Sequence, residues 1–272
     1  VRATAISLFT LAPAKGPRWH LAVQAAVAIS LPIAVLTLLG QPQLGYLAAS
    51  GSFAALFGSG LVARERIRVV MLVGVGLWVS AAAGALAGPS LPATLIGLVI
   101  VSVGASALAF GFSLGPPGPL FAVLVFGISA HVSSAGGSLP VIVAAVGGGI
   151  ALTCLVVAAP LVRPREWRRP RRSLSRILPG PGWPAPKRIL LLRVVVVTIV
   201  GAAVGLWIDP SRAYWVVGAA VAVIGITPDR WTAVTRGIHR IVGTLLGAGV
   251  YLLVAPTAPT GISSARAASP AS

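Results

Sequence analysis

Continuous apolar runs of about 20 residues alternate with short polar turns along most of the chain. Barrel strands would instead alternate apolar and polar positions, so these runs predict helices. In the hydrocarbon core of a bilayer every backbone group must be paired internally, which such helices achieve. The pattern predicts an all-α integral membrane protein with about nine transmembrane helices, at residues 21–39, 44–63, 69–88, 91–110, 118–134, 139–162, 189–208, 213–227 and 241–258.

Composition supports a lipid environment. Hydrophobic residues make up 57% of the chain and charged residues only 9%, whereas a water-soluble domain carries roughly a quarter charged residues. Eight of the nine predicted spans contain no charged residue. The exception is Arg193, about one turn into the seventh span, where a long side chain reaches the interface by snorkelling.

The charge distribution predicts an orientation. The chain has 21 Lys and Arg against 4 Asp and Glu. With a cytoplasmic N-terminus, all basic residues except Arg212 and Arg266 fall on the cytoplasmic side, as the positive-inside rule requires. The basic segments are expected to contact anionic lipid headgroups of the bilayer. A nucleic-acid partner is not expected, because the charge lies between apolar spans.

Four regions follow from this pattern. Residues 1–162 form a first six-span transmembrane unit, and residues 163–188 form a basic Arg- and Pro-rich cytoplasmic linker. Residues 189–258 hold three further spans, and residues 259–272 form a low-complexity tail. The linker is interpreted as a connector on lipid headgroups, with a partner-binding segment as the alternative. The turn at 111–119 is interpreted as a tight turn, with a broken helix as the alternative.

The second unit resembles the beginning of the first. In each, a basic start, an apolar span and a Pro-containing turn lead to a Tyr, and an Arg-x-x-x-Arg pair precedes the third span. Both units begin inside, so the repeat is parallel. Transporters built from repeats bind substrate near the midplane at the repeat interface. The second unit has three spans instead of six, so we expect it to be truncated, with three further spans missing.

A family resemblance rests on three features of the second unit: Tyr214-Trp215, Pro228-Asp229, and the run Arg-x-x-x-Arg-x-x-Gly-Thr-x-x-Gly over residues 236–247. With these features the chain resembles the fusaric-acid-resistance and aromatic-acid-exporter superfamily, also called the integral membrane bound transporter domain. The resemblance implies a multi-pass protein of the bacterial inner (plasma) membrane that exports aromatic or other organic acids. More distant relatives include plant organic-anion channels.

Candidate substrate-binding residues lie at the expected cytoplasmic mouth and near the spans. Guanidinium groups bind carboxylates through two parallel hydrogen bonds and stay charged at physiological pH. A basic vestibule gathers anions, although the same arginines also serve as orientation signals. Interfacial anchoring and snorkelling are the alternatives for the aromatic residues and Arg193. The substrate-binding candidates are Arg236, Arg240, Arg64, Arg68, Tyr214, Trp215, Arg193 and Gln24.

Coupling and packing candidates are fewer. Asp229, His131 and His239 are the candidates for proton coupling, with an ion pair to Arg230 or Arg236 as the alternative for Asp229. Small residues at four-residue spacing let helix backbones approach closely. This pattern occurs at Gly84–Gly88, Gly201–Gly205 and in the set Gly243, Thr244 and Gly247.

Enzyme chemistry is not expected. No nucleophile–base pair stands out, the three His lack Cys or carboxylates at metal-ligand spacing, and the Gly-rich stretches lack the Lys-Ser/Thr of a phosphate loop. No cofactor or metal is expected. The hypothesis is a secondary transporter that exports small organic anions. The alternatives are an organic-anion channel of the same fold or a non-transporting membrane protein, and homo-oligomer formation is left open.

Overall fold

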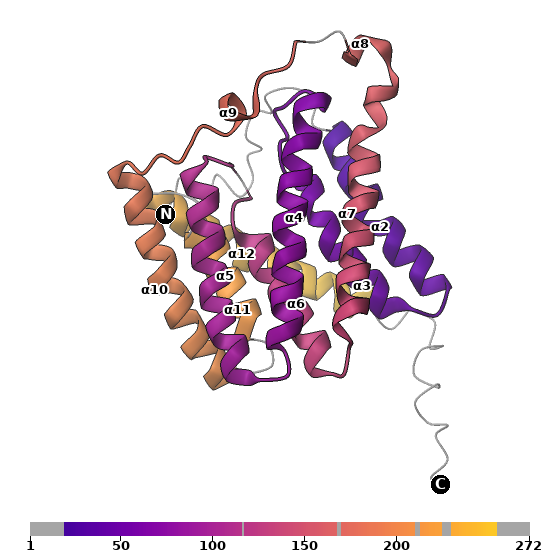
Figure 1. Ribbon diagram of the computed structural model, residues 1–272. Coiled ribbons are helices and arrows are strands. Elements are labelled where there is room, and N and C mark those ends of the chain that lie inside the picture. The colour runs from indigo at the N-terminus through magenta and orange to yellow at the C-terminus, as the bar shows by residue number, and fades with distance from the viewer. Residues whose placement is uncertain (1–18, 116, 168–169, 210–212, 225–229, 255–272) are drawn as a thin grey trace. The chain divides into compact units, whose positions relative to one another are not determined.

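The computed structural model describes residues 19–254 except 116, 168–169, 210–212 and 225–229, and all regular structure in these ranges is helical. The chain divides into two units, residues 13–228 and residues 229–272 with 1–12. Figure 1 shows the helices in chain order. They are α2 (Trp19–Leu38), α3 (Pro42–Gly51), η1 (Ser52–Leu56), α4 (Ala63–Ala87), α5 (Leu91–Gly111), α6 (Leu120–Ser134), α7 (Leu139–Ala158), η2 (Ala159–Val162), α8 (Pro164–Trp167), α9 (Leu174–Ile177), α10 (Ala185–Ile208), α11 (Ala213–Ile224) and α12 (Arg230–Val254).

Five helices are long and apolar enough to cross a membrane: α2, α4, α5, α7 with its η2 extension, and α10. Large apolar side chains cover their outer faces, among them Val75, Ile96 and Leu192, as expected for surfaces that contact lipid. Shorter apolar helices are α6 and segments of α11 and α12. The prediction of a multi-pass helical membrane protein is therefore confirmed, while the count of nine spans stays a prediction.

The second predicted span, 44–63, is wrong as a continuous helix. α3 covers ten residues and passes into the short 3-10 helix η1. The backbone then turns extended at Phe57, and Gly58 adopts a left-handed φ of 68°. At 1.5–2 Å per residue the two pieces together span about 25 Å, short of the roughly 30 Å hydrocarbon core. The composition of the apolar run Phe53–Leu61 predicts a helix. The helix ends instead before the glycines at 58 and 60.

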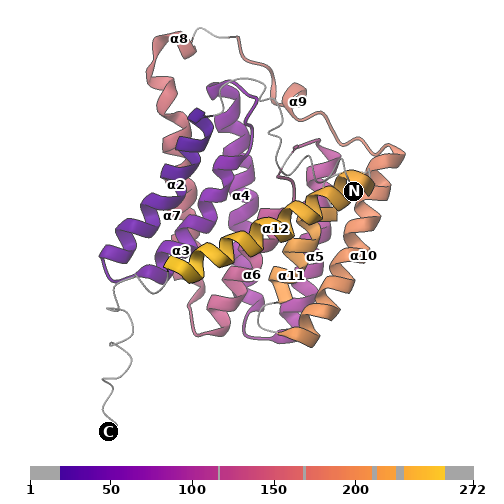
Figure 2. The ribbon, with the colours of Figure 1, turned by 180° about the vertical axis from the view of Figure 1, so that it is seen from behind.

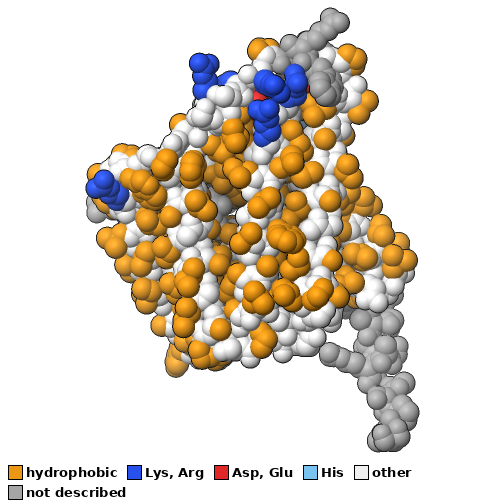
Figure 3. Space-filling view, viewed as in Figure 1, with side chains coloured by type: hydrophobic (Ala, Val, Ile, Leu, Met, Phe, Trp, Pro, Cys, Tyr) orange, Lys and Arg blue, Asp and Glu red, His pale blue; other side chains and the backbone are white. Residues whose placement is uncertain are grey.

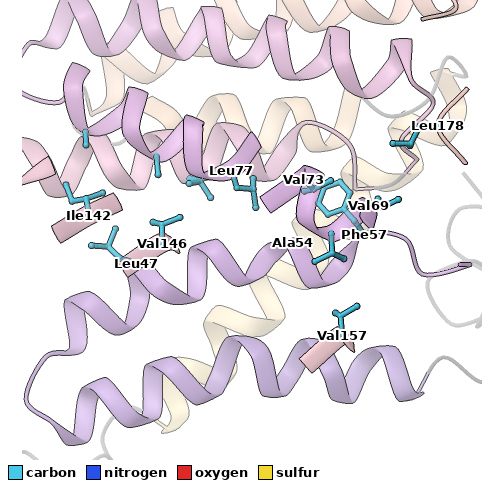
Figure 4. Packing of buried hydrophobic residues seen from close by; sticks show 14 residues of the cluster. Leu47, Ala54, Phe57, Val69, Val73, Leu77, Ile142, Val146, Val157 and Leu178 are labelled. Atoms are coloured by element: carbon cyan, nitrogen blue, oxygen red, sulfur yellow. The ribbon is translucent and has the colours of Figure 1, made fainter. Parts of the chain in front are cut away.

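Close backbone contacts hold the first half of the bundle together. A Cβ added to Gly84 of α4, or to Gly88 directly after it, would lie within 2.4 Å of a backbone oxygen of α6. This confirms the predicted packing role of the pair. Around this interface lies the main apolar cluster, which Figure 4 shows between α3, α4 and α7, with Phe57 and Val69 near the break. The cluster fixes the broken helix against its neighbours.

The hairpin of α10 and α11 packs on α5 and α6, and the two views in Figures 1 and 2 place α10 beside α5. Within the hairpin, a Cβ on Gly205 would lie 2.7 Å from the Cα of Ala213, and one on Gly201 would touch Val217. The predicted packing role of Gly201 and Gly205 is confirmed. A second apolar cluster joins this hairpin to α5 and α6.

Within unit 13–228, the start of α4, the α5–α6 connection and the linker, all predicted to be cytoplasmic, lie at one end. Lys187 donates to Ser113, and the backbone N–H of Gly182 donates to the carbonyl of Gly111. The described residues between α5 and α6 are not helical, and Ser113, Gly115 and Gly118 have positive φ angles. Figure 3 shows Lys and Arg side chains at the end that carries α8 and α9, above a mostly hydrophobic face.

α12 belongs to the other unit. It begins at Arg230, eleven residues before the predicted span at 241, so the basic run Arg236–Arg240 lies on the helix and not in a preceding loop. Gly243, Thr244 and Gly247 are exposed on α12, and the space within 4 Å of an added Cβ at either glycine is open. Their packing role stays a prediction.

Candidate functional site

The break after η1 leaves backbone carbonyls at a helix end inside the bundle. The last carbonyls of a helix have no partner within the helix and carry partial negative charge. One of them belongs to Ala55 of η1, which is completely buried. The next carbonyl beyond the helix belongs to the extended residue Phe57, which is 2% exposed. Because burial of unpaired polar groups is costly, the end of this broken helix requires donors from elsewhere in the fold.

Arg66 of α4 supplies those donors. Its guanidinium is turned into the bundle, and the residue is only 7% exposed. Nη2 donates to the carbonyl of Ala55 at 2.6 Å and Nε to the carbonyl of Phe57 at 3.2 Å, while Nη1 donates to Oε1 of Gln24. An arginine with five N–H donors is well suited to bridge several acceptors. The charge of Arg66 is thus balanced by buried carbonyls at and just after a helix end, and no carboxylate among the described residues forms an ion pair with it.

Gln24 connects this arginine to two helices. It accepts from Arg66 and donates through Nε2 to the carbonyl of Val156 on α7 at 3.3 Å. Thr153 lies about one turn away on α7, is fully buried, and its hydroxyl has no hydrogen-bond partner among the described residues. Polar groups in a membrane bundle mark functional sites by default. We define the broken-helix site as Gln24, Arg66, Thr153 and the carbonyls of Ala55 and Phe57.

The neighbouring residue Glu65 connects the linker to this site through an ion pair with Arg172. Glu65 is 2% exposed in the first turn of α4, where a carboxylate suits the helix dipole. Arg172 of the linker binds it in a forked pair, with Nη2 to Oε2 at 2.8 Å and Nε to Oε1 at 3.1 Å, and its backbone N–H adds a third bond at 2.8 Å. These hydrogen bonds and the opposite charge raise the pKa of Arg172.

Of the predicted residues in the first unit, Gln24 lies in the broken-helix site. Arg64 and Arg68 lie half-buried in the first turns of α4, as a pair on one helix face. Arg66 points elsewhere, because two residues along a helix correspond to about 200° of rotation. The structure therefore brings Gln24 together with the arginine between the two predicted ones.

The two residues of the predicted aromatic pair, Tyr214 and Trp215, lie in different environments. Trp215 is 50% exposed, as an interfacial anchor would be, while Tyr214 is 8% exposed and packs into α6. A Cβ on Gly127 would lie 2.1 Å from Cγ of Tyr214, so only glycine leaves room for the ring there. The Tyr214 ring lies 6.5 Å from the exposed His131. Tyr214 thus joins α11 to α6.

The remaining candidates lie elsewhere. Arg193 is half-buried on α10, next to the fully buried Val194. On α12, His239 is half-buried and Arg240 exposed. The side chain of Arg236 and the whole of Asp229 lie outside the described residues.

Sequence reasoning missed Arg66. The available signal was the pair Gly58 and Gly60 within an apolar run, which predicts a helix break and hence carbonyls in need of donors. Sequence alone could not select Arg66 from the basic run, because the choice depends on which helix face meets η1. Within the described residues no group of three His, Cys, Asp or Glu side chains is arranged to hold a metal ion.

Comparison with known proteins supports the family resemblance. Residues 185–269 match the model of the family described as fusaric acid resistance protein-like. The match starts with α10 and includes α11 and α12, less than half of the chain. It points to a membrane transporter of the efflux or resistance type. No curated protein and no solved structure matches the chain.

Proposed function

We propose that this protein is a secondary transporter that exports small organic anions, aromatic carboxylates above all, across the bacterial inner membrane. The observation that carries the proposal is the buried guanidinium of Arg66 at the end of a broken helix. It is supported by the family match of residues 185–269 and by the multi-pass helical bundle. Irregular backbone at membrane depth is typical of transporter binding sites.

The chemistry of the broken-helix site suits a carboxylate. Arg66 is held by two neutral carbonyls and one amide oxygen. Hydrogen bonds from a guanidinium to a carboxylate are roughly twice as strong as those between neutral groups. An entering carboxylate competes with the carbonyls of Ala55 and Phe57 for the same N–H groups. Its binding would release the end of η1, which links substrate recognition to a movement of the broken helix.

The basic end of the bundle attracts the anionic substrate toward the broken-helix site. Arg64 and Arg68 lie on the first turns of α4, close in sequence to Arg66, and the linker adds further arginines at this end. With a cytoplasmic N-terminus this end faces the cytoplasm, where an exporter collects its cargo. Arg236 and Arg240 of α12, the counterparts of Arg64 and Arg68 in the repeat, stay candidate contacts for the same substrate.

Uptake into inside-out vesicles tests the proposal. We expect labelled benzoate or salicylate to accumulate when a proton gradient is imposed. Arg66→Gln should reduce uptake at least tenfold, because it removes both the charge and the forked donors. Arg68→Gln is the matched control, since it removes the same charge from the same helix end and should cost no more than a few-fold. A fall of equal size in both variants would show that only the general basic surface matters.

Two additional variants separate recognition from folding. Arg66→Lys keeps the charge but loses the fork, and Gln24→Ala removes one partner but keeps Arg66. The site is supported if both variants insert into the membrane and melt as the unaltered protein does, but take up less substrate. No uptake by the unaltered, folded protein would contradict the transport proposal, and uptake that follows voltage without a proton gradient would favour the channel alternative.

A further inference from the structure

Three fully buried hydroxyl groups lie on two neighbouring helices, α5 of the first repeat and α10 of the second repeat. Ser102 and Ser106 belong to α5, and Thr198 belongs to α10. All three residues are 0% exposed, and none of the three hydroxyls has a hydrogen-bond partner among the described residues. Since hydroxyls without partners are costly in a dry apolar interior, these groups require an explanation.

The hydroxyls face the same apolar cluster. Ser102 follows Leu98 by one turn on α5, and Thr198 lies one turn from both Val194 and Ala202 on α10. Leu98, Val194 and Ala202 are all members of the second cluster. α5 and α10 pack against each other and run in opposite directions, as Figures 1 and 2 show. The hydroxyl stripes of the two helices thus line one seam.

Two of the hydroxyls, those of Ser102 and Thr198, also lie at a similar distance from the same end of the bundle. Ser102 is about 16 Å along the helix axis from Leu91, where α5 begins, and Thr198 is about 15 Å from Ile208, where α10 ends. Both helix ends lie at the same end of the bundle. Ser106 lies about 6 Å further along α5. The seam therefore carries hydroxyls near the middle of a membrane about 30 Å thick.

Packing alone does not explain why these hydroxyls have no partner. Two serines elsewhere in this bundle donate to the carbonyl four residues earlier: Ser30 to Ala26 at 2.7 Å, and Ser80 to Gly76 at 2.9 Å. This local bond is the usual choice for a hydroxyl in a membrane helix. Ser102, Ser106 and Thr198 do not make it, so their donors and acceptors are free for an external partner.

We propose that the seam formed by Ser102, Ser106 and Thr198 is a binding site for an uncharged hydrogen-bonding group of a small organic acid, such as a protonated carboxyl or a phenolic hydroxyl. The surrounding cluster is apolar and aromatic, which suits a neutral group and an aromatic ring. We expect waters to bridge the hydroxyls when the acid is absent. The inference rests on the proposed function and places a second contact for the same substrate at the repeat interface.

Thiol labelling tests the seam without requiring transport. The chain has one cysteine, Cys154, so Cys154→Ala gives a cysteine-free background. Ser102→Cys and Thr198→Cys are then treated with N-ethylmaleimide in membranes. Ala81→Cys is the matched control, because Ala81 is also 0% exposed but lies in the dry core of α4. We expect labelling at 102 and 198 at least tenfold faster than at 81, and slowed severalfold by salicylate at low pH.

The outcomes are distinct. Labelling at 102 and 198 no faster than at 81 would overturn the proposal, since the seam would be dry. Fast labelling that salicylate does not slow would overturn the assignment of an organic acid as ligand. A failure of vesicle uptake would not affect either reading, because labelling measures access of water and ligand and not transport.

A double variant checks for a structural role. Ser102→Ala with Thr198→Val removes two unpartnered hydroxyls at nearly constant shape, so the melting midpoint should stay equal or rise. Salicylate binding or uptake should fall at least tenfold. A lower midpoint with unchanged uptake would show that the hydroxyls hold the helices together, and would count against the site.

Discussion

Gly149→Ala should loosen the broken helix from α7. A Cβ at Gly149 would lie 1.8 Å from the carbonyl oxygen of Ala48, and Gly51 makes the reciprocal approach to Val146 at 2.2 Å. Ordinary contact begins at 3.4 Å, so α3 and α7 must separate by roughly 1.5 Å. The separation also stretches the 3.2 Å hydrogen bond from Ser52 to the Gly149 carbonyl. Overpacking costs about 1–3 kcal/mol, and a lost interhelical hydrogen bond adds about 0.6 kcal/mol.

Gly148→Ala is the matched control for this prediction. Gly148 is the preceding residue of α7, and the space within 4 Å of an added Cβ is open. The same chemical change should therefore gain up to about 1 kcal/mol from helix propensity. Thermal unfolding in detergent can be followed with a fluorogenic thiol dye at Cys154, the single cysteine and half-buried on α7. Equal melting midpoints for the two variants would refute the reasoning.

Three other predictions follow from single contacts. Arg172→Ala should leave the buried Glu65 unpaired and free the linker, so trypsin should cut residues 170–184 severalfold faster than in Arg171→Ala, its exposed neighbour. Gly127→Ala should displace Tyr214 from α6 and lower the midpoint by several degrees, whereas Gly104→Ala on α5, with open space around it, should not. Ser133→Ala removes the 2.7 Å bond to the Ala85 carbonyl and should cost about 0.6 kcal/mol, more than Ser134→Ala, which loses only a bond within its own helix.

Length and hydropathy were enough to predict most helices. The predicted spans 91–110 and 118–134 differ from α5 and α6 by no more than two residues at either end. Here the apolar run ends in Gly- and Pro-rich turns, where composition and backbone geometry agree. The starts of α4 and α12 were predicted six and eleven residues late, because the basic residues at 64–68 and 236–240 were counted as loop although they continue the helix toward the interface.

The broken second helix could not be read from hydropathy, because Phe53–Leu61 is apolar whether it is helical or not. Its break depends on Gly58 and on tertiary donors: without Arg66 the carbonyls of Ala55 and Phe57 would be buried and unpaired. Gln24 was a sequence candidate because it precedes Tyr46 by nearly the same number of residues as Arg193 precedes Tyr214. The structure gives Gln24 a partner in Arg66. The inward direction of Arg66 depends on the meeting of three helices, which one sequence does not encode locally.

The first and second repeats have similar helix arrangements but differ in the side chains at equivalent positions. α3 has ten residues and α11 has twelve, so the second helix of each unit is short and packs against the first. Aligning Arg64 with Arg236 places Ile238 at the position of Arg66. An isoleucine has no donor, so the second unit cannot satisfy a helix end in the way that Arg66 does. If the helix arrangements are equivalent, the charged contact belongs to the first unit, and the hydroxyl seam with α10 supplies the neutral contact. An organic acid with one ionised carboxylate and one uncharged hydrogen-bonding group, such as the phenolic hydroxyl of salicylate, matches this division.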